Sequence, residues 1–148
     1  MRLLLLISMS GSALRVFVGI SQSDRPEMSF AHPTKYVGKH LLIEVFVKDV
    51  STLNRENMLN TMLMACNATG ATIIHHHDHQ FSPQGCSGVI LLAESHASWH
   101  TFPELGYASV DIFTCGNCDP WKAITVLMRE LETLDVRVKE EYRGLGVQ

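Results

Sequence analysis

The chain has 148 residues, 46% of them hydrophobic and 18% charged, which is typical of one globular domain with a real core and excludes a disordered chain. Its formal net charge is −3 and it has no cluster of lysine or arginine, so a dedicated nucleic-acid binder is also excluded. A chain with this much core does not need a disulfide framework. Its four cysteines therefore indicate reduced thiols in the cytoplasm.

The first 35 residues are expected to be an extension or linker before a domain at residues 36–148. The start, MRLLLLISMSGSALRVFVGIS, resembles a signal peptide, but serine and glycine interrupt its apolar run, so no transmembrane helix and no membrane partner are expected. Residues 1–27 are interpreted as a nonessential extension, or as sequence upstream of a true start at Met28. Residues 21–37 are polar, contain two prolines and predict a linker.

Alternating strand and helix patterns then follow along the chain. Apolar residues at helical spacing predict a first helix that Asn54 or Ser51 caps and Gly70 ends. Asp119 and Pro120 predict the start of a second helix, as N-cap and first helical residue. Apolar and β-branched runs predict strands at 40–47, 71–81, 88–93, 107–114 and 136–142, with the run at 88–93 buried. The order predicts an α+β two-layer sandwich, a mainly antiparallel sheet with two helices on one face.

The Glu94-Ser95 bond is the most reactive-looking feature of the chain. It follows the strand predicted at 88–93 and is expected to precede a tight polar turn. Ser95 has two chemical options there: attack on a substrate, or attack on its own preceding carbonyl. The ester formed by the second route breaks by β-elimination and leaves a pyruvoyl group, which forms a Schiff base with an amine and accepts electrons. The alternative is a strand-end serine that only bonds backbone.

Two further side chains fit such chemistry. His100 follows Ser95 by five residues, and a tight segment would fold it back as a base. Cys115 ends a strand just before the second helix, whose N-terminus favours a thiolate that exchanges protons near neutral pH. The alternatives are a histidine that satisfies a polar neighbour and a cysteine that packs as a small apolar residue.

These residues lie in segments that resemble a known family. GKHLLIE at 38–44, FSPQGCSGVILLAESH at 81–96, AESHASWHTFPELGYASVDIFTCG at 93–116 and DPWKA at 119–123 resemble the bacterial-type S-adenosylmethionine decarboxylases. The resemblance spans about residues 36–144 and keeps the order of the family's motifs.

The resemblance implies a self-processing, pyruvoyl-dependent decarboxylase of S-adenosylmethionine, whose product supplies aminopropyl groups for spermidine. The proenzyme would cut itself between Glu94 and Ser95, giving a β chain and an α chain that begins with the pyruvoyl group made from Ser95. His100 would accept a proton during self-processing, and Cys115 would protonate the substrate α-carbon. Two αβ units would associate, with pockets near the subunit interface.

The resemblance also implies a substrate pocket. Glu104 matches a carboxylate that binds the ribose, and Phe81 is expected to stack on the adenine. Phe102 stands where the family usually has tryptophan and is expected to bind substrate, while Trp99 replaces a common aliphatic residue and is expected to shape the pocket. Leu105 replaces an aromatic residue. Because these changes fall in the expected pocket, another amino acid such as arginine stays an alternative substrate.

Two competing sites are visible in the sequence. Cys115 and Cys118 form a CxxC motif between a strand and a helix, the context of a thioredoxin-like redox site, but the expected βαβ order is missing. His75, His77 and His79 would share one face of a strand, and three imidazoles suit zinc. No fourth ligand is specified, so no metal is expected.

Two other classes of function are weaker alternatives. A Ser95–His100–Asp111 hydrolase has the right residue types but lacks the G-x-S-x-G nucleophile turn. A binding-only domain would have no chemical reason to keep Ser95, His100 and Cys115 together.

Overall fold

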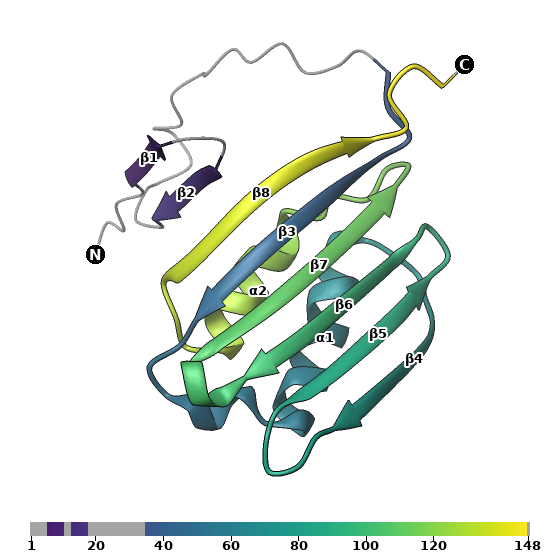
Figure 1. The fold of residues 1–148 in the computed structure, drawn as a ribbon. Coiled ribbons are helices and arrows are strands. Elements are labelled where there is room, and N and C mark those ends of the chain that lie inside the picture. Colours follow the sequence, from purple (N-terminus) through teal and green to yellow (C-terminus); the bar gives the residue numbers. More distant parts are fainter. Residues whose placement is uncertain (1–5, 11–12, 18–34, 148) are drawn as a thin grey trace.

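The computed structural model describes residues 6–10, 13–17 and 35–147. Eight strands form one antiparallel sheet in the order β1-β2-β8-β3-β7-β6-β5-β4, and two helices lie against one of its faces (Figure 1). This confirms the predicted α+β sandwich. The strands are β1 Leu6–Ser10, β2 Ala13–Phe17, β3 Gly38–Phe46, β4 Ile73–Gln80, β5 Cys86–Leu92, β6 His96–Phe102, β7 Tyr107–Cys115 and β8 Asp135–Arg143.

Two helices pack on the sheet, and the first begins and ends at residues suited to those positions. Helix α1 spans Arg55–Thr69: the Asn54 side chain caps it by accepting from the Asn57 N–H at 3.0 Å, and Gly70 ends it at φ 85°. Helix α2 spans Lys122–Glu130. It begins two residues later than the predicted start at Pro120, although the Asp119 carboxylate accepts from the Trp121 N–H at 3.2 Å. Two short 3-10 helices are η2 Val50–Leu53 and η3 Pro103–Leu105.

The core lies between the helices and the sheet face that they cover. Alternate residues of the central strands point into it, because successive side chains of a strand lie on opposite faces. Burying these apolar side chains stabilises the fold by about 25 cal/mol for each Å² of apolar surface that is removed from water. No described element covers the other sheet face, called here the open face, which is turned toward the viewer in Figure 1. Fully buried core side chains include Leu41, Ile43, Met58, Met62, Ile90, Trp99, Val110, Ile112 and Leu127.

Strand β6 is the main departure from prediction. Residues 96–102 were expected to form a polar turn, but they form a strand between β5 and β7. Their polar residues alternate with Ala97, Trp99 and Thr101, all buried, so the segment is a half-buried strand with a polar open side. Strand β5 was expected to be buried throughout, yet Val89 and Leu91 are 46% and 51% exposed on the open face.

Trp99 lies in the core and cannot shape a pocket on the open face. Its ring lies over Gly88, the residue directly opposite on β5. A Cβ at Gly88 would be 2.1 Å from the indole ring, so only glycine leaves room for it.

The N-terminal segment is described only in part. Strands β1 and β2 form a hairpin, and β2 pairs with β8 at the edge of the domain sheet. Most of the linker predicted at 21–37 lies outside the described residues, which resume at Lys35. No helix in the described part of the chain is long and apolar enough to span a bilayer.

Candidate active site

The side chains singled out from the sequence lie along the open face, in two groups at opposite ends of the sheet. Ser95 and Cys115 are at the end where β5 turns into β6. His100, Phe102, Glu104 and Phe81 are at the other end. Strand β6 separates the groups: His100 is four residues beyond His96, about 13 Å at ~3.3 Å per residue.

Ser95 sits in the tight turn between β5 and β6. Its backbone N–H donates to the Leu92 carbonyl at 3.2 Å, and the Leu92 N–H donates to the Ser95 carbonyl at 2.9 Å. The Ser95 hydroxyl lies 3.3 Å from Nδ1 of His96. The Glu94 carboxylate accepts from the Thr72 N–H at 2.9 Å, and this bond is the main cause of the lowered pKa of Glu94. The Glu94–Ser95 bond is thus held in a fixed, accessible turn.

Cys115 ends β7 at the same end of the sheet. Strand β6 pairs with β7 so that His96 is opposite Phe113, two residues before Cys115. Cys115 is opposite Gly38 of β3, and a Cβ at Gly38 would lie 2.8 Å from the Cys115 sulfur. Glycine at that position therefore leaves the thiol room on the open face.

The second group lines a cavity of about 360 Å³. Phe81 and Phe102 are 49% and 38% exposed there, and Glu104 accepts a hydrogen bond from the Gln84 amide at 3.2 Å. His100 also lines the cavity, and its Nδ1 is 2.6 Å from the Ser87 hydroxyl on the neighbouring strand. The three residues expected to bind substrate are thus together in one cavity, which is lined by Phe81, Gln84, Gly85, Ser87, His100, Thr101, Phe102 and Glu104.

The expectation that His100 folds back onto Ser95 within one chain is wrong. Residues 96–102 are extended, so the strand carries His100 away from Ser95 instead of returning it. The two side chains are at opposite ends of β6, and His100 is engaged with Ser87.

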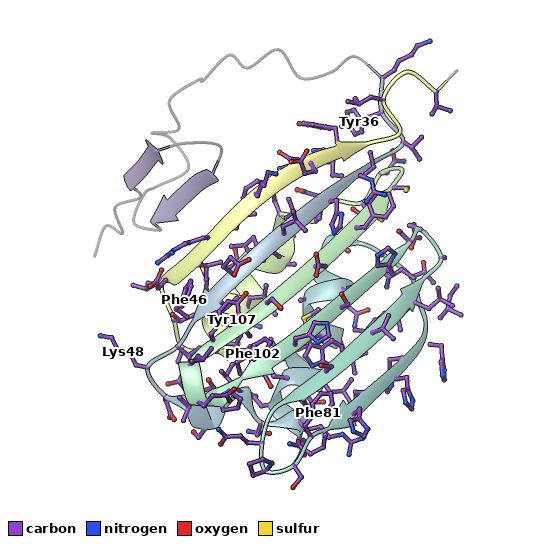
Figure 2. All side chains as sticks on the ribbon, viewed as in Figure 1. Tyr36, Phe46, Lys48, Phe81, Phe102 and Tyr107 are labelled. Atoms are coloured by element: carbon purple, nitrogen blue, oxygen red, sulfur yellow. The ribbon has the colours of Figure 1, made fainter. Side chains whose placement is uncertain are left out.

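A row of aromatic rings lies at the cavity end of the open face, where β3 and β6 end and β7 begins. The Tyr107 ring stacks on Phe102 at 5.5 Å between centroids and packs on Phe46 at 5.3 Å, as Figure 2 shows. The Tyr107 hydroxyl donates a short hydrogen bond to Glu44. Desolvation, together with that acceptor, raises the pKa of Tyr107 to about 12.

His40 lies on the same face toward the end that carries Ser95, opposite Phe113. Nη1 of Arg143 donates to its Nδ1 at 3.2 Å, so the ring proton is on Nε2, which lies 3.3 Å from the Asp111 carboxylate. Burial is the largest cause of its lowered pKa, which favours this neutral form. The His40 and His96 rings meet edge to face with centroids 6.4 Å apart.

The competing sites find little support. His75, His77 and His79 do share the open face, opposite Leu91, Val89 and Ser87. Within the described residues, however, no group of three or more His, Cys, Asp or Glu is placed to hold a metal ion. Asp111, proposed for a hydrolase, faces His40 and not His100.

The CxxC motif also departs from a redox site. Cys115 and Cys118 are both free. Burial, with the charges of Glu94 and Cys115, raises the pKa of Cys118, whereas an attacking redox thiol needs a lowered one.

Sequence reasoning missed Ser87, and it offered His96 only as a possible base near Ser95 without assigning it a step. Ser87 is hidden in the apolar run of β5, and its place beside His100 depends on the pairing register of β5 with β6, which no local pattern specifies. The neighbour relation of His96 to Ser95 was readable from the sequence. Its pairing with Phe113 and His40 was not.

The α+β domain carries a serine in a hairpin turn, a free thiol at the same end of the sheet and an aromatic, carboxylate-bearing cavity. These groups suit an enzyme better than a redox or metal protein. Comparison with known proteins gives the family. The family model for S-adenosylmethionine decarboxylase matches residues 39–144. The chain belongs to the S-adenosylmethionine decarboxylase family.

Individual relatives agree with that assignment. The S-adenosylmethionine decarboxylase proenzyme of Thermosipho africanus is 45% identical over 112 residues, which cover 74% of this chain and 86% of the relative. That of Caldanaerobacter subterraneus subsp. tengcongensis is 41% identical over 111 residues, covering 74% and 90%. The crystal structure of the Aquifex aeolicus adenosylmethionine decarboxylase superposes with a TM-score of 0.67 at 33% identity, covering 74% of this chain and 92% of that one.

Proposed function

We propose that the chain cuts itself between Glu94 and Ser95, converts Ser95 to a pyruvoyl group, and then decarboxylates S-adenosylmethionine to the aminopropyl donor used for spermidine. The observation that carries this proposal is the Glu94–Ser95 bond itself, held in an exposed hairpin turn with an imidazole nitrogen 3.3 Å from the serine hydroxyl. The free cysteines suit the reducing cytoplasm, where we expect the enzyme to act.

The residues at this turn fit a pyruvoyl group made in place. Such a group supplies an electrophilic carbonyl that binds the substrate amine and takes up the electrons released with carbon dioxide. Ser95 is the first residue after the bond to be cut, and Cys115 is at the same end of the sheet, where Gly38 leaves its sulfur room. Cys115 holds the proton that is delivered to the substrate α-carbon.

The cavity at the other end of the sheet suits the nucleoside half of the substrate. The Glu104 carboxylate has two acceptor oxygens for the paired hydroxyls of a ribose, and only one of them is taken by Gln84. The exposed rings of Phe81 and Phe102 offer flat faces for adenine. Aromatic faces also attract the sulfonium cation of S-adenosylmethionine.

One protomer alone has these two halves too far apart for a single substrate. A two-fold arrangement of two copies, open face against open face, brings the Ser95 end of one chain to the cavity of the other. Val89, Leu91 and Phe102 give the open face the exposed apolar surface that such an interface requires. In this assembly His100, with Ser87, reaches Ser95 from the second copy.

Intact mass and carbon dioxide release test the proposal. The wild-type chain should run as two fragments split between Glu94 and Ser95, the second with the mass of a pyruvoyl terminus, and it should release carbon dioxide from S-adenosylmethionine. Ser95→Ala should stay whole and inactive, whereas Ser98→Ala, on the same face of β6, should still cut. An uncut wild-type chain without activity would sink the proposal, and release from arginine instead would reassign the substrate.

A further inference from the structure

We propose that His96 is the base that takes the hydroxyl proton of Ser95 in the first step of self-cleavage, which leaves to His100 only the later proton transfer from the Ser95 α-carbon. This inference rests on the proposed function. It adds a catalytic residue that acts within one chain, before the second copy is needed.

The contact between the two residues carries the inference. Nδ1 of His96 lies 3.3 Å from the Ser95 Oγ, within reach of a hydrogen bond and of a proton transfer. With its own proton on Nε2, a neutral His96 ring presents the Nδ1 lone pair to the hydroxyl. Among the described residues, no other side chain is within hydrogen-bond distance of the Ser95 hydroxyl, so His96 is the base available to it.

The His96 ring is held in place by neighbouring strands. It packs edge to face on Phe113 with centroids 5.7 Å apart, and on His40 at 6.4 Å. His40 is itself fixed between Arg143 and Asp111. This chain of contacts orients the imidazole toward the Ser95 turn, although the ring remains exposed to solvent.

His100 cannot perform the same task in the same chain. It is about 13 Å further along β6 and bonds Ser87. Self-cleavage needs two proton removals, one from Oγ and one from the α-carbon. Each histidine is therefore assigned one proton removal. His96 of the same chain takes the proton from Oγ, and His100 of the second copy takes the proton from the α-carbon.

The first step balances without any further reactant. Oγ of Ser95 bonds to the carbonyl carbon of Glu94 while the hydroxyl proton moves to Nδ1 of His96. The peptide C–N bond then breaks, and the imidazolium returns the proton to the leaving nitrogen, which becomes the free amine of Ser95. The product is an ester between the Glu94 carbonyl and Ser95 Oγ, with no change in oxidation state.

Hydroxylamine separates the two steps, because it cleaves esters rapidly and peptide bonds slowly. His100→Ala should accumulate the ester, so hydroxylamine should cut this variant between Glu94 and Ser95. In His96→Ala/His100→Ala the ester should form at least about tenfold more slowly, given the usual contribution of a general base. His77→Ala/His100→Ala, which removes another histidine of the open face, should behave as His100→Ala alone. The fragments are quantified by mass spectrometry.

Added imidazole gives a second readout, since the exposed His96 site is open to a small base. Imidazole should accelerate ester formation in His96→Ala/His100→Ala and leave the His77 control unchanged. Equal cutting of the His96 and His77 double variants would overturn the inference while the proposed function stands. So would a slow His96 variant that unfolds at a lower temperature than the control and gains nothing from imidazole. If the wild-type chain is never cut, it is the proposed function that fails.

Discussion

Cys115 and Cys118 are three residues apart, yet their surroundings assign them different chemistry. Cys118 faces the Glu94 carboxylate, and burial with that charge raises its pKa and keeps it a neutral thiol. Cys115 lies on the open face beside Phe113, with Gly38 opposite. Only Cys115 therefore has both room and a position next to the Ser95 turn.

Replacing Cys115 should separate the making of the active site from its use. We expect Cys115→Ala to cut itself normally but to release carbon dioxide at least about 100-fold more slowly, because general acids typically contribute 10²–10⁴-fold. Cleavage is measured by intact mass and turnover by carbon dioxide release. Cys118→Ala is the matched control and should retain most activity. Full turnover in Cys115→Ala would show that another group supplies the proton.

Replacing Glu104 tests whether the cavity binds the nucleoside half of the substrate. Loss of a charged acceptor costs about 1.5–3 kcal/mol, so Glu104→Gln should raise KM for S-adenosylmethionine roughly 10- to 100-fold. Self-cleavage should be unchanged, because Glu104 takes no part in either of the two proton transfers of that reaction. Glu130→Gln, on α2, serves as the control. A normal KM in Glu104→Gln would place the ribose elsewhere.

At the level of elements, the packing of β5 against β6 depends on the close contact between Gly88 and the Trp99 ring. The Trp99 indole occupies the space that a side chain at Gly88 would need. Gly88→Ala should therefore lower the free energy of unfolding by about 1–3 kcal/mol, the usual cost of overpacking a core. His76→Ala, an exposed position of β4 outside the open face, should cost less than about 0.5 kcal/mol. Urea unfolding measures both, and equal losses would contradict the packing argument.

Helix α1 makes stability sensitive to alkaline pH through Cys66. Its burial raises the thiol pKa to about 12, from an ordinary value of 9.0. The unfolded chain releases this proton above pH 9 while the folded chain keeps it. The stabilisation is therefore complete below pH 9 and is lost as the pH rises toward 12.

We expect Cys66→Ala to flatten that alkaline decline. The variant should be less stable than wild type at pH 7, because it leaves a small cavity, but its unfolding free energy should fall less steeply above pH 9. Urea unfolding with a thiol reductant, at a series of pH values, gives both curves. Parallel curves for the two proteins would exclude Cys66 as the cause.

Prediction from sequence succeeded where local chemistry decides the outcome. The caps Asn54 and Gly70, the strand β3 and the two-layer architecture were all predicted, because each follows from residue type and spacing. Strand β6 was missed because its polar open side, with His96 and His100, has the composition of a turn. Because β6 was taken for a turn, His100 was wrongly expected to lie next to Ser95 in the same chain.

At the scale of the whole molecule, shared catalysis between copies is directly testable. The Ser95→Ala chain keeps His100, and the His100→Ala chain keeps Ser95, so each variant has the residue that the other lacks. Co-expression should yield mixed dimers in which the His100→Ala chain acquires a pyruvoyl terminus, detected by mass on a tagged copy. A partner with both substitutions offers no His100 and should give no such product. Dimers that never process the His100→Ala chain would refute supply from the second copy.

The proposed place of the cut would also determine how the mature enzyme loses its fold. Cleavage at the β5–β6 turn would leave β3 on one fragment, between β7 and β8 of the other. The fragments could then separate only if the sheet came apart. Once unfolded, however, the two fragments would have to meet by diffusion in order to refold, because the cut peptide bond is not remade. Self-cleavage would thus make unfolding irreversible. The chain would fold as one molecule, and the rate of its first unfolding after cleavage would set the lifetime of the enzyme.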